Sequence, residues 1–255
     1  MQPSVTLETK CWEQDWEFLL RTRRIEQTIE RSRFNFAKRT LCINNVDDVG
    51  KVCRYAQKLV NSGILTDFLV VAEKEKSALD FYQLPKESLT SGFVYSIAEL
   101  VGLYMCETDY LLHFSGDSRP TTESTWLASA LSRMESDARA KVANLTWNGN
   151  YAEAAAESFA EDDDFYIGYG FSDQMYLVRT SDFRRPDVYH DTNPMSARYP
   201  KYGGELFEKR VDSWMRNHDY YRLTYRHASY LHKNFPRTRW KKKSRLLLER
   251  LGVGR

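Results

Sequence analysis

The sequence predicts an α/β fold with a mostly parallel central sheet and helices on both of its faces. Short apolar, β-branched segments alternate with segments whose apolar residues recur at helical spacing, and this alternation is typical of parallel sheets. Of the 255 residues, 42% are hydrophobic, which is enough for a substantial core. Polar turns also follow two of the predicted strands, and α/β proteins bind their ligands at such strand ends.

The first third of the chain contains a helical pattern over residues 12–33, where the apolar residues form one stripe among many charges. A β-branched segment at 40–43 predicts a strand, which a polar turn and a helix over 49–59 follow. A second short strand is predicted at 67–71 and a second helix at 74–82. Such units of strand, turn and helix build a parallel sheet.

The middle of the chain continues this alternation, and the pattern becomes less regular after residue 150. Residues 184–202 are rich in proline and polar side chains, which is typical of a long functional loop. The remaining predicted elements are helices at 96–106, 122–134 and 205–217, a helix from residue 152 that ends in an acidic loop, and strands at 110–114, 141–147, 175–178, 221–225 and 229–232. We expect three parts, namely an N-terminal helical extension (1–37), a principal domain (38–235) and a basic amphipathic tail (236–255).

The composition excludes several classes of protein. No apolar run approaches the roughly 18 residues of a membrane span, and the first residues lack the basic start and apolar stretch of a secretion signal. We therefore expect a cytoplasmic protein. The four cysteines, at positions 11, 42, 53 and 106, lie far apart without a CxxC pair. This spacing favours reduced, mostly buried thiols over a zinc site or a disulfide framework.

The C-terminal region differs sharply in charge from the rest of the chain. From Tyr220 onward there are eleven Lys or Arg residues and a single acid, although the whole chain carries a net charge of only +2. Leucines and a tryptophan lie among these charges, which favours a basic amphipathic helix at an anionic membrane surface, with the protein peripheral at the inner face. The alternative is a helix whose leucines dock on its own domain. No nucleic-acid partner is expected, because no reading motif accompanies the charges.

The predicted strand at 110–114 runs directly into the small acidic turn Ser115, Gly116 and Asp117. A carboxylate on a rigid strand end, beside a glycine that allows close approach, suits a divalent cation that carries a diphosphate. An ordinary turn rich in Asp, Ser and Pro is the alternative.

The first unit of strand, turn and helix offers amide and carboxylate groups that can read a base or a ribose. These groups belong to Asn44, Asn45, Asp47 and Asp48. Asp47 is equally suited to cap the helix that follows.

Five segments together resemble the nucleotide-sugar glycosyltransferases of the GT-A fold, in particular the large inverting family that includes many polysaccharide enzymes of bacterial or viral type. The likeness covers residues 38–235 and follows the order of the family's motifs. The segments are TLCINNVDD (40–48), HFSGDSRP (113–120), FSDQMYL (171–177), GGELFEKRVDSWM (203–215) and SYLHKNF (229–235).

The resemblance implies a nucleotide-sugar donor with Mn²⁺ or Mg²⁺ as cofactor. HFSGDSRP lies where the family has its Asp-x-Asp motif, and Ser115 stands at the first Asp position, so strict metal dependence is open. Asp117 would anchor the metal, and His232 resembles a further ligand, with a structural hydrogen bond as its alternative role. The donor's diphosphate would contact Ser115, Gly116, Asp117 and Arg119, and its nucleoside the turn after residue 43.

An acceptor hydroxyl loses a proton as it attacks, and a carboxylate beside the anomeric carbon can take that proton. Glu205 and Glu208 are the candidates, because the family places its catalytic acid in this segment. We favour Glu205 as the base, since a Gly pair precedes it and gives the substrate close access, and Glu208 is its rival. Alternatively, both are surface acids that pair with a neighbouring Lys or Arg.

Acceptor or sugar contacts are expected at Asp173 and, in the loop 184–202, at Arg185 and Tyr189. Arginine binds phosphates, and aromatic rings pack on sugar faces. An ordinary turn residue is the alternative for Asp173.

The leading hypothesis is therefore transfer of a sugar from a nucleotide donor to a glycan or lipid-linked acceptor, by single displacement with inversion. A sugar nucleotidyltransferase uses a similar sheet, but the segment 44–51 lacks a convincing Gly-rich phosphate loop. A non-catalytic protein that kept the fold is the third hypothesis, and Ser115 is its best support.

Overall fold

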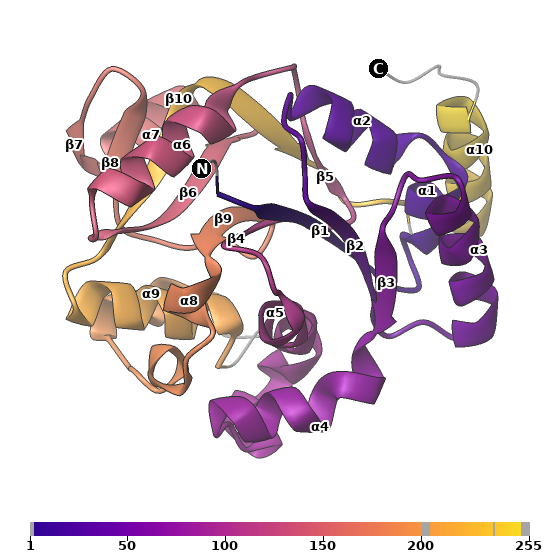
Figure 1. The fold of residues 1–255 in the computed structure, drawn as a ribbon, viewed down its shortest axis with the longest axis horizontal. Coiled ribbons are helices and arrows are strands. Elements are labelled where there is room, and N and C mark those ends of the chain that lie inside the picture. Colours follow the sequence, from indigo (N-terminus) through magenta and orange to yellow (C-terminus); the bar gives the residue numbers. More distant parts are fainter. Residues whose placement is uncertain (1–2, 200–204, 237, 251–255) are drawn as a thin grey trace.

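The structure is a computed structural model that describes residues 3–199, 205–236 and 238–250. In this part of the chain, one sheet has the strand order β3-β2-β1-β4-β9-β6-β10-β8-β7, and β5 pairs with β10 (Figure 1). The strands are β1 (Val5–Cys11), β2 (Lys38–Ile43), β3 (Asp67–Val70), β4 (Tyr110–Phe114), β5 (Ser118–Pro120), β6 (Ala140–Trp147), β7 (Ser158–Glu161), β8 (Phe165–Gly168), β9 (Met175–Arg179) and β10 (Tyr221–His232).

The helices alternate with these strands through most of the chain. They are α1 (Trp16–Arg21), α2 (Arg24–Arg31), α3 (Val49–Asn61), α4 (Val71–Tyr82), α5 (Phe93–Met105), α6 (Trp126–Ser136), α7 (Tyr151–Ala156), α8 (Thr180–Phe183), α9 (Phe207–Asn217) and α10 (Arg239–Arg250), with short 3₁₀ turns η1 (Lys86–Gly92), η2 (Pro186–Tyr189) and η3 (Pro194–Arg198). No helix in the described ranges is both long and apolar enough to cross a lipid bilayer.

The predicted α/β class is confirmed. Pairing is parallel through β3-β2-β1-β4 and again between β6 and β10, whereas β9, β8, β7 and β5 pair antiparallel to their neighbours. The carboxyl ends of β1, β2 and β4 therefore lie along one edge of the sheet, the edge at which α/β proteins bind ligands.

Helices cover both faces of the sheet, and successive residues of the strands alternate between the two cores. Leu111 of β4 and Val178 of β9 pack with α4, α5 and α9. Their neighbours Leu112 and Leu177 point the other way and pack with α6. Figure 1 shows α4, α5 and α9 on one side of the sheet and α2 and α6 on the other. This alternation is the strand period of two in a sheet buried on both sides.

The N-terminal segment differs from the expectation of a purely helical extension over 1–37. Residues 5–11 form β1, which lies between β2 and β4 in the middle of the sheet. The strand escaped prediction because Glu8 and Lys10 interrupt its apolar pattern. Glu8 is nevertheless only 2% exposed, and its carboxylate lies 2.9 Å from Nδ1 of the buried His113. Pairing of this kind allows a charged residue to occupy a central strand. Where the chain divides into domains remains a prediction.

Other elements differ in smaller ways. The helix expected over 12–33 is two helices, α1 and α2, and the segment after residue 156 contains β7 and β8, which the sequence did not indicate. The two strands expected at 221–225 and 229–232 are one strand, β10, with an irregularity between Tyr225 and Ser229. The helix expected from residue 205 begins at Phe207. The four cysteines are free thiols, and three of them are buried.

Candidate functional site

The acidic turn after β4 is held tightly by its neighbours. The Ser115 hydroxyl donates a hydrogen bond to Asp117 Oδ1 (3.0 Å), and the Ser115 backbone N–H donates to the carbonyl of Gln174 (2.9 Å). A Cβ atom at Gly116 would lie 2.8 Å from the carbonyl oxygen of Lys10 and 2.5 Å from Asp15 Oδ2. Glycine is thus required here for close approach of β1, not for a special backbone angle.

His232 comes from the far end of the chain and lies next to Asp117. β5 pairs antiparallel with the end of β10, which places His232 opposite Ser118. Nδ1 of His232 lies 3.4 Å from Asp117 Oδ1 and 3.2 Å from the Ser118 hydroxyl. The backbone N–H of His232 donates to Asn148 Oδ1 (2.8 Å), which fixes this strand end. The structure therefore brings together the two residues expected to bind a metal.

This pair fits a divalent cation whose remaining ligands are diphosphate oxygens and water. One carboxylate oxygen and one imidazole nitrogen lie side by side, and their side chains are 18% and 19% exposed. Mn²⁺ and Mg²⁺ accept one or two protein ligands when phosphate oxygens and water fill the other positions. No group of three or more metal-ligating side chains occurs among residues 3–199, 205–236 and 238–250, so the donor set is sparse.

Asp15, which the sequence analysis missed, lies against the same turn. Its carboxylate accepts a hydrogen bond from the Trp12 backbone N–H (2.8 Å) and is almost completely buried. Burial raises the pKa of Asp15 well above its usual range, the bond from Trp12 opposes this, and the charge of Asp117 raises the pKa further. Recognition of β1 as a strand would have placed this acid at the ligand-binding edge.

A second pair of acids lies beside the turn. Glu208 is in the first turn of α9, and its Oε1 accepts a hydrogen bond from the Asp173 backbone N–H (2.6 Å). Burial, and then the charge of Asp173, raise the pKa of Glu208 well above its usual range. Lys10 lies 3.6 Å from Asp173 and lowers this pKa, and it also pairs with the buried Glu99.

The two pairs are connected through the chain itself. Gln174, which accepts the hydrogen bond from Ser115, directly follows Asp173. Lys10 contacts Asp173 with its ammonium group, and its carbonyl oxygen lies against Gly116. The Asp117–His232 pair and the Asp173–Glu208 pair are therefore neighbours at the carboxyl edge of the sheet.

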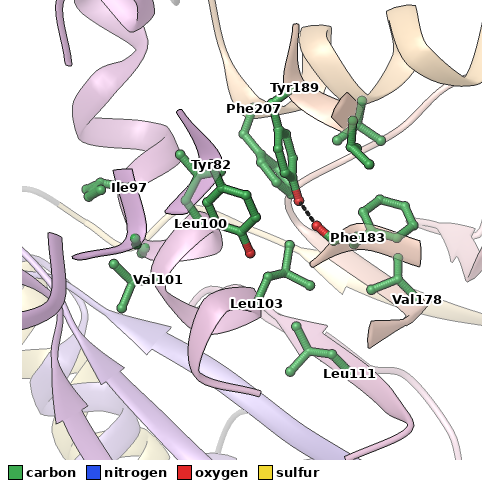
Figure 2. Close-up of a cluster of buried hydrophobic side chains, with 14 of the residues drawn as sticks. Tyr82, Ile97, Leu100, Val101, Leu103, Leu111, Val178, Phe183, Tyr189 and Phe207 are labelled. Carbon is green, nitrogen blue, oxygen red and sulfur yellow. Dashed lines mark hydrogen bonds between the residues drawn. The ribbon is translucent and has the colours of Figure 1, made fainter. Parts of the chain in front are cut away.

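Packing in the core fixes the start of α9, and with it Glu208. Phe207 is buried, its ring stacks on Tyr189 with the centroids 5.6 Å apart, and its backbone N–H donates to the Ser96 hydroxyl (2.8 Å). Figure 2 shows Tyr189 and Phe207 side by side in this cluster, with the Tyr189 hydroxyl directed at the carbonyl of Phe183 (2.8 Å). Tyr189 thus belongs to the core, so the expectation that it contacts an acceptor is wrong in this structure.

Glu205 lies apart from the second acid pair. It precedes α9 by two residues, and its carboxylate is 2.5 Å from Nζ of Lys209. This is the surface ion pair that the sequence analysis held as the alternative. The Gly pair that favoured Glu205 lies outside the described residues.

Not all of the other residues expected to contact the acceptor or the donor lie in the site. Asp173 lies in the site, whereas Arg185 makes an exposed double hydrogen bond with Asp187 (3.0 and 2.6 Å). Arg119 on β5 is half-buried, and burial first, then the charge of Arg24 on α2, lower its pKa. Arg119 therefore lies near the cationic Arg24 and Arg31 of α2, and the nearby acid Glu249 of α10 only partly offsets their effect.

The turn after β2 joins the same edge of the sheet. Asn44 donates its backbone N–H to the carbonyl of Cys11 (2.9 Å), and the carbonyl of Asn45 accepts from Glu13 (3.2 Å). Asp48 is the N-cap of α3 and accepts from the Lys51 backbone N–H (2.8 Å). Asp47, for which that role was considered, has an exposed side chain.

A cavity of about 290 Å³ opens next to the second acid pair, between α7 and the strands β6 and β10. Its walls carry amide, hydroxyl, guanidinium and aromatic groups from Asn144, Trp147, Gln174, Arg222, Thr224 and Tyr230. The Tyr230 hydroxyl donates to Gln174 Oε1 (3.3 Å), and the Thr224 hydroxyl donates to Asn144 Oδ1 (3.0 Å). Sequence reasoning missed this cavity, because its residues are far apart in the chain.

The chain has the GT-A fold, as the resemblance implied. Among solved structures, GalNAc-T7 in complex with UDP, GalNAc and Mn²⁺ matches over 90% of this chain with a TM-score of 0.57 and 8% identity. TarS of S. aureus matches over 98% of this chain with a TM-score of 0.53 and 11% identity. The chain spans less than half of each, 44% and 43%. No protein-family model and no curated protein sequence matches the chain.

Proposed function

We propose that this protein is a glycosyltransferase, which transfers a sugar from a nucleoside diphosphate sugar to an acceptor hydroxyl with inversion. The observation that carries this proposal is that an acid–imidazole pair and an acid pair adjoin each other at the carboxyl edge of the sheet. Asp117 and His232 suit the leaving diphosphate, and the Asp173–Glu208 pair suits the incoming alcohol. A single displacement needs both functions on opposite sides of the anomeric carbon.

The leaving group gains negative charge as its bond to the sugar breaks, and fixed cations or dipoles must stabilise that charge. Asp117 and His232 would hold Mn²⁺ or Mg²⁺ here, and the bound ion would neutralise the diphosphate. The Ser115 hydroxyl orients the Asp117 carboxylate through its hydrogen bond. With Ser in place of the motif's first acid, the metal would depend mainly on these two side chains.

Glu208 is proposed as the general base in preference to Glu205. A raised pKa makes a carboxylate a stronger proton acceptor once it is ionised, and the best catalytic pKa lies near the working pH. The charge of Lys10 opposes the rise in the pKa of Glu208, and this helps the Asp173–Glu208 pair to release its proton. Asp173 lies beside Glu208 and is suited to accept a sugar hydroxyl.

The donor's nucleoside is assigned to the turns after β1 and β2. Asn44, Asn45 and Asp47 offer amide and carboxylate groups there, and Trp12, which is 46% exposed, offers an aromatic face for a base. These turns are joined to one another by backbone hydrogen bonds.

The acceptor is assigned to the cavity beside Tyr230. Amide and hydroxyl groups there can exchange hydrogen bonds with a polyhydroxylated molecule, and the partly exposed Trp147 offers a flat apolar surface for a sugar ring. This lining favours a glycan, or the sugar part of a lipid-linked glycan.

Titration calorimetry with a panel of nucleoside diphosphates, with and without Mn²⁺, tests the proposal together with an assay of donor turnover. We expect binding that Mn²⁺ strengthens, and release of the nucleoside diphosphate when donor sugar and acceptor are present. Tight nucleotide binding without turnover of any donor would favour a non-catalytic protein. Release of pyrophosphate would favour a nucleotidyltransferase.

A further inference from the structure

Helix α10 has one face that is fixed to the body of the protein. Arg24 donates two hydrogen bonds to the Glu249 carboxylate (2.8 and 2.9 Å), and both side chains of this ion pair are nearly buried. Leu246 is 7% exposed and packs with Phe18 and Phe235, whose rings stack 4.0 Å apart. These contacts set the rotation of α10 about its own axis.

The opposite face of α10 is exposed and mostly apolar, and Ser244 in its middle turns its hydroxyl back to the carbonyl of Trp240 (3.0 Å). Trp240, Leu247 and Leu248 are 64%, 58% and 48% exposed. At 3.6 residues per turn, these three positions fall within an arc of about 100° on the helix surface. They cannot turn inward while Leu246 and Glu249 remain in place. The docking of the helix on its own domain therefore leaves most of its large apolar side chains without cover.

Basic residues border this apolar arc on both sides. Lys241 follows it on one side, Lys243 and Arg250 lie on the other, and all three are exposed. The acid of the helix, Glu249, is on the inward face, where Arg24 engages it. An apolar stripe between two rows of cations is the pattern of a helix that lies in the interface of an anionic bilayer.

We propose that the outer face of α10 binds an anionic membrane surface. Trp240, Leu247 and Leu248 enter the boundary between headgroups and acyl chains, and the flanking cations contact lipid phosphates. A second copy of the chain fits less well, because two such faces would bring their basic rows together. The short apolar stripe implies reversible binding that depends on anionic lipid.

α10 lies near the candidate site, but the membrane proposal does not rest on the proposed sugar transfer. α10 follows β10, whose last residue is His232, and Nζ of Lys242 donates to the carbonyl of Glu13 (3.2 Å) beyond the end of β1. A membrane at the outer face of α10 would thus lie near the carboxyl edge of the sheet. Membrane binding can be measured with no donor or acceptor present, so its failure is separable from a failure of the proposed transfer.

Co-sedimentation with lipid vesicles tests the proposal on the full chain. We expect binding to vesicles of phosphatidylserine with phosphatidylcholine, little binding to phosphatidylcholine alone, and weaker binding at high salt. Lys241→Glu with Lys243→Glu should weaken binding by about 5-fold or more for each charge. Leu247→Ser with Leu248→Ser should weaken it about 10-fold or more, because less apolar area enters the lipid.

Two control variants make comparable changes of charge and of apolar surface elsewhere. Lys74→Glu with Lys76→Glu reverses two charges on α4, which Figure 1 places far from α10. Phe159→Ser with Met195→Ser removes two exposed apolar side chains from other parts of the surface. Both controls should bind vesicles as the unaltered protein does, and circular dichroism should show all four variants folded.

Four results would overturn the proposal. The first is absence of binding to phosphatidylserine vesicles even at low salt, and the second is an equal loss in the control variants, which would indicate non-specific adsorption. The third is a self-association that Leu247→Ser with Leu248→Ser abolishes while vesicle binding stays unchanged, which would assign the face to a second copy. Loss of nucleic-acid binding in the Lys variants, with vesicle binding intact, would likewise contradict it.

Discussion

The Asp117–His232 pair and the Asp173–Glu208 pair, both at the carboxyl edge of the sheet, differ in what each can hold. Asp117 lies beside an imidazole, and both side chains of this pair can donate electron pairs to a cation. Asp173 and Glu208 bring two carboxyl groups together where burial raises the pKa of Glu208. Like charges in a poorly solvated place favour retention of a proton. Neighbouring acids thus become a cation site or a proton site according to their partners and solvation.

The largest effect is expected from Asp117→Asn, which tests the cation side of the comparison. The amide keeps the shape and can still accept the Ser115 hydrogen bond, but it removes the charge proposed to anchor a metal. We expect loss of sugar transfer by about 10³-fold or more and loss of metal-assisted nucleotide binding, since stabilisation of the leaving group is a dominant contribution. Activity assays and calorimetry measure both. Asp163→Asn, an exposed acid in a loop, is the control, and an active Asp117→Asn variant would remove Asp117 from the site.

The next largest effect is expected from Glu208→Gln, which tests the proton side. A general base contributes about 10²-fold or more, so transfer should fall by this factor while donor binding is retained. Glu205→Gln is the matched control, and because Glu205 pairs with Lys209 at the surface we expect less than about a 3-fold change. The reverse pattern, with Glu205→Gln inactive and Glu208→Gln active, would make Glu205 the base.

The same two regions differ in how well the sequence predicted them. The turn after β4 is a contiguous segment behind an apolar strand, so its position at the sheet edge followed from the strand pattern. The pairing of Asp117 with His232 joins residues more than 100 positions apart, and only the resemblance to a family suggested it. Asp15 and the ion pairs of Lys10 with Glu99 and Asp173 were missed because β1 was not recognised as a strand. Its charged residues Glu8 and Lys10 find their partners on other strands and helices.

Helical spacing in the sequence could not decide between Glu205 and Glu208, because it does not locate the first residue of the helix. The residues are three positions apart, so a helix beginning at 205 would place both near its first turn. The packing of Phe207 against Tyr189 sets the start of α9 instead, and those two residues meet only through tertiary contacts. The buried position of Tyr189 was hidden for the same reason, since the polar loop around it predicted exposure.

A moderate effect is expected on the pH dependence of stability. Since the folded state raises the pKa of Glu208 above its unfolded value, it binds this proton more tightly. The resulting stabilisation is fully present below the unfolded pKa and is lost as pH rises through the folded pKa. Glu208→Gln lacks this loss. The melting temperature of the variant minus that of the unaltered protein should therefore be a few degrees more positive at pH 8 than at pH 5. Thermal unfolding at both pH values measures the difference, and an equal change at both would contradict the raised pKa.

The smallest effect is expected from Ser115→Ala, which tests how the cation pair is oriented. The substitution removes only the hydroxyl that donates to Asp117, and one such hydrogen bond to a charged group contributes about 1.5 to 3 kcal/mol at most. Water can replace part of it at this partly exposed turn, so we expect a loss of about 3- to 10-fold in metal-assisted nucleotide binding. Ser118→Ala is the comparison variant, because its hydroxyl lies 3.2 Å from His232. If Ser115→Ala binds nucleotide and metal as well as the unaltered protein, then the carboxylate of Asp117 is positioned by the backbone of the turn and not by the Ser115 hydroxyl.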